Sequence, residues 1–387
     1  MSEFDPIRSY TDDEYRESVT RLMNDAGFVS AADSFLGEDG RRSVFADALR
    51  YRNANELQKG LILPMVQQFL QKLGSELSFR FNDIDCVSDR YVFISNHRDI
   101  VLDPSLLSTC LALSGANGVE IAIGDNLLIS KWIEEFVRIN KSFIVKRSLT
   151  SQSEFLEFSR LLSSYIHHVI GTRKDSVWIA QREGRAKDSN DLTQRSLLKM
   201  LSMSGGSGTL DSLKELHIVP LAISYEYDPC DWLKAMEFQL KRDNPDYRKT
   251  RENDRLNMAT GIRGYKGRIH LQSAPCIDGL IDTVDQSKPR NIQLDEVAKI
   301  IDRGIHSSYR IYTSNRIALD LLSGGSSQRQ YYTCEDKKVF ENYLIKQLSN
   351  IDIPNPDWDF LRRKILEMYA NPLINQLKAS GISQELV

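Results

Sequence analysis

The feature that most constrains this fold is an alternation of short apolar runs with helix-like segments, which begins near residue 91. The first run covers residues 91–95 (YVFIS), and further runs cover residues 119–123, 142–145, 176–180, 216–225 and 267–272. Short apolar runs of this length are typical of buried strands. Helical patterns at 127–139 and 154–170 separate them, and Gly171 is the expected cap of the second helix. The alternation predicts an α/β fold with a mixed, largely parallel sheet flanked by helices.

The regions on either side of this alternation are expected to be helical. Residues 1–88 mix charged and apolar residues at helical intervals, and the segment 57–73 contains Pro64, which predicts a kink or two shorter helices. Helical patterns return at residues 294–311, 316–322, 337–348 and 358–369. We therefore expect an N-terminal helical bundle over 1–88, an α/β domain over 89–292 and a C-terminal helical region over 293–387 packed on it. The Gly/Ser-rich stretch 202–208 and the mixed-charge stretch 241–255 are predicted to be surface loops.

Composition excludes several classes of protein. The 50 Lys and Arg residues and 53 Asp and Glu residues give a net charge of −3, which does not suit a general nucleic-acid binder. No segment approaches the ~18 apolar residues that a membrane span needs, and the polar start of the sequence is unlike a signal peptide. The five cysteines are scattered and form no C-x-x-C pair, which argues for reduced thiols and against a zinc site. We expect a cytoplasmic protein with no metal and no cofactor.

The sharpest candidate site is the polar cluster SNHRDIVLDP at residues 95–104, which follows the first apolar run. Sites in α/β sheets form at the carboxyl ends of strands, and His97 is the histidine placed there. An imidazole with a pKa near ~6.5 can act as a neutral base, and Asp99 or Asp103 could fix its tautomer. From this local pattern alone, a helix cap formed by Asn96 and Asp99 beside an incidental histidine is the commoner explanation.

Two further predicted strands end in positively charged residues. These residues are Lys146 and Arg147 after the strand 142–145, and Arg185 and Lys187 in the segment Arg182-Glu183-Gly184-Arg185-Ala186-Lys187 after the strand 176–180. Arginine binds phosphate through two parallel hydrogen bonds, lysine acts as a point charge, and glycine allows close approach of the backbone. Each pair alone is more simply a solvated strand end. Two pairs at consecutive strand ends predict an anion pocket of the size of one phosphate.

Other reaction classes have little support in the sequence. It contains no G-x-S-x-G elbow, no phosphate-binding G-x-x-x-x-G-K-[ST] loop and no H-E-x-x-H motif. The adjacent His167 and His168 lie within a helical pattern, and we expect surface or packing positions for both. His217 and His270 lie within or beside strand patterns, and we expect them to be structural.

The order of these motifs resembles the glycerol-phosphate acyltransferase superfamily. The hallmarks of that superfamily are an N-H-x4-D box, a cation-bearing strand, an E-G or G-G-R box and a V-P-L/V-A strand. The matching segments, in the same order, are NH…DP at residues 96–104, FIVKR at 143–147, EGR at 183–185 and IVPLAI at 218–223. The resemblance spans roughly residues 93–275. It is greatest to the soluble, plastid-type glycerol-3-phosphate acyltransferases, which also carry a helical N-terminal domain.

The resemblance implies a role for each matching residue. His97 matches the catalytic histidine and Asp103 matches the box aspartate. Five residues separate the two here, where the family has four, so Asp99 stays an alternative. The substrate-binding residues implied are Lys146, Arg147, Glu183, Gly184, Arg185 and Lys187, of which the cations hold the phosphate of the acceptor. The backbone amides at the start of the following helix are candidates for stabilising an oxyanion.

The activity implied is transfer of a fatty acyl group from an acyl thioester to a hydroxyl of glycerol 3-phosphate in phospholipid synthesis. The donor would be acyl-CoA or acyl carrier protein, no cofactor is needed, and His97 is the general base. Contact with the inner face of the membrane would be peripheral, through residues 57–73 or 312–322, although core packing explains those segments more simply. Lysophosphatidate or another lysolipid is the alternative acceptor. A catalytically inactive module that binds lipid or a carrier protein is the alternative of a different class.

Overall fold

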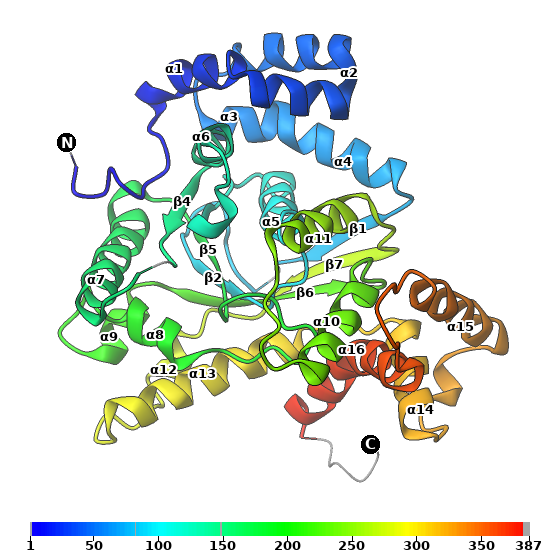
Figure 1. The fold of residues 1–387 in the computed structure, drawn as a ribbon. Helices are drawn as coiled ribbons and strands as arrows, with labels where there is room; N and C mark the ends of the chain where they lie inside the picture. Colours follow the sequence, from blue (N-terminus) through cyan, green and yellow to red (C-terminus); the bar gives the residue numbers. More distant parts are fainter. Residues whose placement is uncertain (1, 82, 148, 382–387) are drawn as a thin grey trace.

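The computed structural model describes residues 2–81, 83–147 and 149–381, and its described part is built around one seven-stranded sheet (Figure 1). The strands are β1 (Glu76–Arg80), β2 (Val92–Ser95), β3 (Glu120–Gly124), β4 (Ser142–Val145), β5 (Val177–Ala180), β6 (Ile218–Tyr225) and β7 (Arg268–Ser273). Their order across the sheet is β1-β7-β6-β2-β5-β3-β4. Strands β6, β2, β5, β3 and β4 run parallel, whereas β7 is antiparallel to β6 and β1 is parallel to β7. The predicted α/β fold with a mixed, largely parallel sheet is confirmed.

The central strands could be predicted from the sequence because helices cover both of their faces. Every residue of β2 and β6 is buried, and strands covered on both sides consist of nearly continuous apolar residues. The five parallel strands place their carboxyl ends on one edge of the sheet. That edge therefore carries the residues that follow β2, β4 and β5, where the sequence predicted the site.

Helices cover both faces of the sheet (Figure 1). On one face, Leu106 and Leu107 pack in the same apolar cluster as Phe93 of β2, and on the other Leu162 and Ile301 pack with Ile94. The α-helices are α1 (Asp12–Met23), α2 (Ala26–Ala48), α3 (Ala54–Leu57), α4 (Leu63–Lys72), α5 (Leu102–Leu113), α6 (Lys131–Ile139), α7 (Gln152–His168), α8 (Arg195–Leu201), α9 (Thr209–Lys214), α10 (Asp231–Asp243), α11 (Arg251–Arg263), α12 (Asp278–Ile281), α13 (Arg290–Ser307), α14 (Thr313–Ser323), α15 (Cys334–Leu348) and α16 (Trp358–Ala379).

The C-terminal helices form an apolar cluster of their own. Leu319 of α14, Phe340 of α15 and Leu361 of α16 pack together with Ala235 of α10, which belongs to the central α/β part of the chain. The division of the chain at residues 88 and 292 stays a prediction. However, the expectation that residues 76–80 are helical is wrong, because they form β1 beside β7. Exposed and partly buried residues alternate over only five positions in this edge strand, which is too short a pattern to identify it from the sequence.

Other predicted element boundaries differ in detail. Residues 54–72 are continuously helical, because the π-helical turn Gln58–Ile62 joins α3 to α4 and Pro64 lies in the first turn of α4, where its missing amide costs little; the kink expected at Pro64 stays a prediction. The helix expected to stop at Gly171 instead continues through the π-helical turn Val169–Arg173, and Lys174 takes the left-handed capping conformation. The loop predicted at 241–255 is shorter, since α10 ends at Asp243 and α11 begins at residue 251. Residues 202–208 lack regular structure, as predicted.

Candidate active site

The loop after β2 is fixed to the neighbouring strand by Asn96. The Asn96 amide nitrogen donates to the carbonyl of Ile223 at 2.9 Å, and its amide oxygen accepts from the Ile223 backbone at 2.9 Å. Asn96 therefore anchors the loop on β6 and does not cap a helix. Asp99 does act as a cap, because its Oδ1 accepts from the amides of Val101 and Leu102 at the start of α5. Of the two residues that the local sequence pattern suggested as helix caps, Asp99 is a cap and Asn96 is not.

His97 contacts Asp103 at the end of this loop. The Nδ1 atom of His97 lies 2.8 Å from Oδ2 of Asp103, which is fully buried in the first turn of α5. The same Oδ2 accepts from the amides of Arg98 at 2.6 Å and Asp99 at 3.0 Å, and Oδ1 accepts from the Tyr225 hydroxyl at 2.9 Å. A buried carboxylate is tolerated when its oxygens are hydrogen-bonded in this way.

The extra residue between His97 and Asp103 is taken up by the loop. Helix α5 begins only at Leu102, so the segment from residue 98 to residue 101 can curl around the Asp103 carboxylate and donate two amides to it. Of the two candidate carboxylates, Asp103 is the one in contact with the His97 ring. Burial, and then the neighbouring Asp103 charge, raise the pKa of Asp99.

Two aromatic residues that the sequence analysis did not single out lie next to the pair formed by His97 and Asp103, which we call the dyad. The Trp178 ring meets His97 edge-on, with ring centroids 5.5 Å apart, and its indole N–H donates to Ser95 Oγ at 2.9 Å. Tyr225, at the end of β6, is buried, and burial together with the Asp103 carboxylate raises its pKa well above the ordinary value. Tyr225 therefore stays protonated and donates to Asp103.

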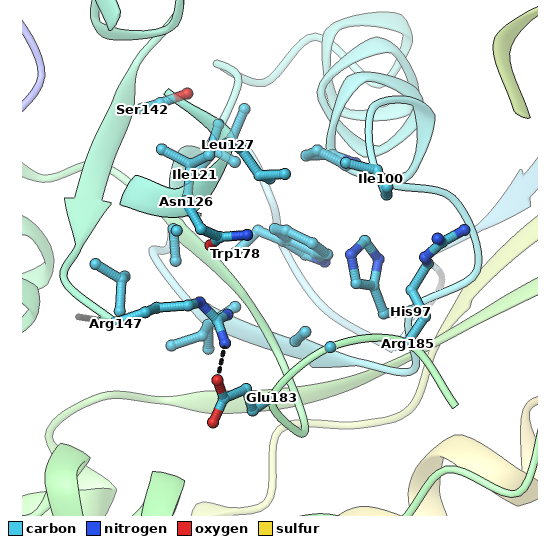
Figure 2. A pocket seen from close by; sticks show the side chains of 18 of the residues that line it. His97, Ile100, Ile121, Asn126, Leu127, Ser142, Arg147, Trp178, Glu183 and Arg185 are labelled. Atoms are coloured by element: carbon cyan, nitrogen blue, oxygen red, sulfur yellow. Dashed lines mark ion pairs between the residues drawn. The ribbon is translucent and has the colours of Figure 1, made fainter. Parts of the chain in front are cut away.

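A cavity of about 790 Å³ opens at the carboxyl ends of the parallel strands and contains His97 in its wall (Figure 2). The same wall contains every substrate-binding residue predicted from the sequence, namely Lys146, Arg147, Glu183, Gly184, Arg185 and Lys187. It also contains polar residues that the sequence did not single out, namely Lys234, Lys249 and Asn257. In Figure 2 the His97 ring is drawn between Trp178 and Arg185, with Arg147 and Glu183 farther along the cavity. The structure thus gathers the predicted base and the predicted cations around one space.

The cations of this cavity already have protein partners. Arg147 forms an ion pair with Glu183 at 2.5 Å, and the Arg185 guanidinium donates to Asn257 Oδ1 at 3.3 Å. Lys187 pairs with Glu237 at 3.0 Å, and burial lowers the pKa of the Lys187 ammonium although Glu237 opposes this. Lys146 lies over the Phe158 ring, 5.7 Å from its centroid. A bound anion must therefore either displace these partners from the cations or bind to the cations alongside them.

The remaining wall of the cavity is apolar. Aliphatic and aromatic side chains from β3, α6, α7 and α8 contribute to it, among them Ile123, Phe136, Phe155, Phe158 and Met200. Phe155 remains 59% exposed and Phe136 38% exposed, so apolar surface continues to the outside of the protein. One space thus offers an imidazole held by a carboxylate, several cations and an apolar surface, which suits a ligand with an anionic group and a hydrocarbon group.

No helix in the described part of the chain combines the length and the apolar character that crossing a bilayer requires.

Comparison with known proteins finds likenesses among solved structures. No family model matches the chain, and no curated protein matches it. Among solved structures, it is similar to the 1-acyl-sn-glycerophosphate (LPA) acyltransferase PlsC from Thermotoga maritima, with a TM-score of 0.34 and 12% sequence identity. The alignment covers 74% of this chain and 94% of that one. A likeness at this TM-score carries no argument about activity, so the proposal below rests on the site.

Proposed function

We propose that this protein is an O-acyltransferase that moves a fatty acyl group from an acyl thioester to a hydroxyl of glycerol 3-phosphate. The donor is acyl-CoA or acyl carrier protein, and the product enters phospholipid synthesis. The observation that carries the proposal is the contact between His97 and Asp103 in a wall shared with cations and apolar side chains.

His97 is the proposed general base. Because Nδ1 faces the Asp103 carboxylate, the tautomer consistent with this contact carries its proton on Nδ1. Nε2 then has a free lone pair for the proton of the attacking hydroxyl. Asp103 orients the ring and stabilises the imidazolium that forms.

The proposed reaction needs no group beyond the two substrates. The acceptor oxygen attacks the thioester carbonyl carbon while its proton passes to Nε2 of His97. The tetrahedral intermediate collapses, the carbon–sulfur bond breaks, and the departing thiolate takes the proton from the imidazolium. An ester and a free thiol result, and His97 returns to its neutral form. A positioned base of this kind contributes ~10²–10⁴-fold to the rate.

The acceptor phosphate is assigned to the cations. Arg185 and Lys187 follow β5, and Lys146 and Arg147 follow β4, so both pairs leave the sheet at the same edge as His97. The Arg147–Glu183 pair is well exposed, which makes it inexpensive to separate, since exposed ion pairs contribute at most ~1 kcal/mol. We therefore propose that the phosphate displaces Glu183 from Arg147 when the acceptor binds.

The amides at the start of α5 are poor candidates for an oxyanion site. The amides of Arg98 and Asp99 donate to Asp103, and those of Val101 and Leu102 donate to Asp99. These donors hold the dyad in place and are not directed at a substrate. The sequence-based expectation for the helix start therefore has no support at these positions.

A lysolipid is the second candidate acceptor. The same cations fit any phosphomonoester, and the apolar wall reaches the exposed Phe136 and Phe155, where a second hydrocarbon chain could lie. Both acceptors lead to a lipid product, so the proposal includes peripheral contact with the inner face of the membrane.

A panel of donors and acceptors tests the proposal. Purified protein is mixed with acyl-CoA or acyl carrier protein and with glycerol 3-phosphate, lysophosphatidate or unphosphorylated glycerol, and release of the free thiol is followed. The proposal predicts release that depends on glycerol 3-phosphate and is lost in His97→Ala. Release that requires lysophosphatidate supports the second candidate. If none of the pairs of donor and acceptor gives acceptor-dependent release, the result would indicate an inactive binding module.

A further inference from the structure

A cluster of three potential metal ligands lies away from the candidate active site, at the amino end of β6. His217 directly precedes β6, and Cys276 and Asp278 follow β7. Because β7 runs antiparallel to β6, the end of one strand adjoins the start of the other, and the Ile277 amide donates to the Ile218 carbonyl at 3.0 Å. The cavity that contains His97 opens at the carboxyl ends of the parallel strands, which is the opposite edge of the sheet.

The three side chains offer one ligand atom each within a small space. An imidazole nitrogen, a thiol sulfur and a carboxylate oxygen all lie within 4.8 Å of one another. Zinc and its first-row neighbours bind nitrogen, sulfur and oxygen ligands together, whereas Mg²⁺ and Ca²⁺ prefer oxygen alone. We propose that His217, Cys276 and Asp278 bind one divalent ion of the zinc class, with a fourth position open to solvent.

The state of Asp278 supports this assignment. Its Oδ2 lies 2.7 Å from Nδ1 of His217, and its carboxyl also interacts with the Cys276 thiol, whereas its buried Oδ1 has no nitrogen or hydroxyl donor among the described residues. A buried carboxylate oxygen without a partner is uncommon and calls for an explanation such as an ion. A cation between the carboxylate and the thiol would satisfy it.

The charges around the cluster also favour a cation. The charge of Asp89 acts on Cys276, and the charges of Asp282, Asp278 and Asp211 all act on Lys214. Lys214 is the partner of Asp282, at 2.5 Å, and interacts more weakly with Asp278. The local excess of carboxylates attracts positive charge.

Binding has a defined chemical balance. The ion takes the place of the proton between His217 Nδ1 and Asp278 Oδ2, which moves to Nε2 of the ring by exchange with water, so the neutral imidazole binds through Nδ1. It also replaces the thiol proton of Cys276, which passes to the buffer. The bound ion then joins the start of β6 to the start of α12, and it stabilises the folded chain by mass action. This proposal does not depend on the proposed acyl transfer.

Cobalt titration of the full chain, without an affinity tag and stripped of metal, tests the site. We expect one Co²⁺ per chain, thiolate-to-cobalt charge-transfer absorption, visible bands of a four-coordinate site, and displacement of the cobalt by Zn²⁺. Cys276→Ser should abolish the charge-transfer absorption, and Cys334→Ser, which removes an exposed thiol elsewhere, should leave it unchanged. His217→Asn and Asp278→Asn should weaken affinity by at least ~10-fold. Asparagine is chosen at 217 because φ is +46° there, a conformation that asparagine tolerates.

A second measurement keeps the test decisive if a variant folds poorly. In the wild-type chain, Zn²⁺ should slow alkylation of Cys276 and leave Cys334 unaffected, as followed by mass spectrometry of the two cysteine peptides. Absence of charge-transfer absorption in the wild-type chain, or absorption that survives in Cys276→Ser, would overturn the proposal. Equal alkylation of Cys276 with and without Zn²⁺ would overturn it as well.

Discussion

The imidazole of His97 and the carboxylate of Asp103 lie 2.8 Å apart, although five residues separate them along the chain. A loop rather than a helical turn joins them, and two amides of that loop donate to the carboxylate. The loop is in turn anchored on β6 through Asn96. The position of the Asp103 carboxylate therefore depends on hydrogen bonds that do not involve the His97 side chain.

Replacing each candidate carboxylate separates their roles. In Asp103→Asn we expect kcat for acyl transfer to fall at least ~10²-fold, because the ring loses the partner that fixes its tautomer. In Asp99→Asn we expect kcat to stay within a few-fold, since asparagine still caps α5, and stability to change by less than ~1 kcal/mol. Steady-state rates and urea midpoints measured on both variants check this. The opposite ranking of the two rates would assign the role to Asp99.

Tyr225→Phe tests whether the hydroxyl that donates to Asp103 affects catalysis. Loss of the hydroxyl leaves Oδ1 without its 2.9 Å donor, so the carboxylate interacts more strongly with the imidazolium. Because stabilisation of the imidazolium sets the barrier of the proton transfer, kcat for acyl transfer should change while KM for both substrates stays the same. The folded state should also lose ~1–3 kcal/mol for the unpaired oxygen. An unchanged kcat, with stability lowered as expected, would reduce Tyr225 to a purely structural residue.

Arg185→Ala tests the assignment of the phosphate. We expect KM for glycerol 3-phosphate to rise by the equivalent of ~1–3 kcal/mol, the range for a lost charged hydrogen bond, while KM for the thioester changes little. Arg195→Ala is the matched control, because Arg195 forms an exposed pair with Asp295 and lies outside the cavity wall. If the acceptor saturates Arg185→Ala as it saturates the control, the phosphate binds elsewhere.

Asp231 should make stability depend on pH. Burial, and then the Asp228 charge, raise the pKa of Asp231 to about 7, although Tyr343, Gln347 and Tyr369 donate to it. An acid with a raised pKa binds its proton in the folded chain at pH values where the unfolded chain has released it. Its contribution to stability is therefore full below the unfolded value, near ~4, and is lost as the pH rises through about 7.

Urea unfolding of the wild type and Asp231→Asn at pH 5 and pH 8 measures this dependence. The wild type should lose more stability than the variant on going to pH 8, by up to ~3 kcal/mol, because the interval from pH 5 to the folded pKa of about 7 spans two pH units. Parallel curves for the two proteins would show that Asp231 does not titrate in this range.

The position of the site could be predicted from the sequence because it depends on parallel strands. Each buried strand is a recognisable apolar run, and parallel strands place their ends on one edge. His97, Lys146 and Arg185 therefore fell into one cavity once their strands were located. The choice between Asp99 and Asp103 stayed open, because the path of a short loop is set by hydrogen bonds that the local sequence does not reveal.

What the sequence did not predict depends on contacts between distant segments. Tyr225 reaches Asp103 from the end of β6, and Lys234, Lys249 and Asn257 enter the cavity wall from the segment after that strand. In the sequence, Trp178 is one residue of an apolar strand, and nothing in that pattern indicates its contact with His97. The cluster at His217 and Cys276 forms only because β7 is antiparallel to β6, a pairing that carries no local signal.

The most direct test of the account is the single-turnover rate of thiol release from an acyl thioester in the presence of glycerol 3-phosphate, compared between the wild type and His97→Ala. The account predicts a rate at least ~10²-fold lower in the variant, with its circular dichroism spectrum and urea midpoint close to those of the wild type. A variant that retains a near-normal rate would contradict the assignment of His97 as the general base.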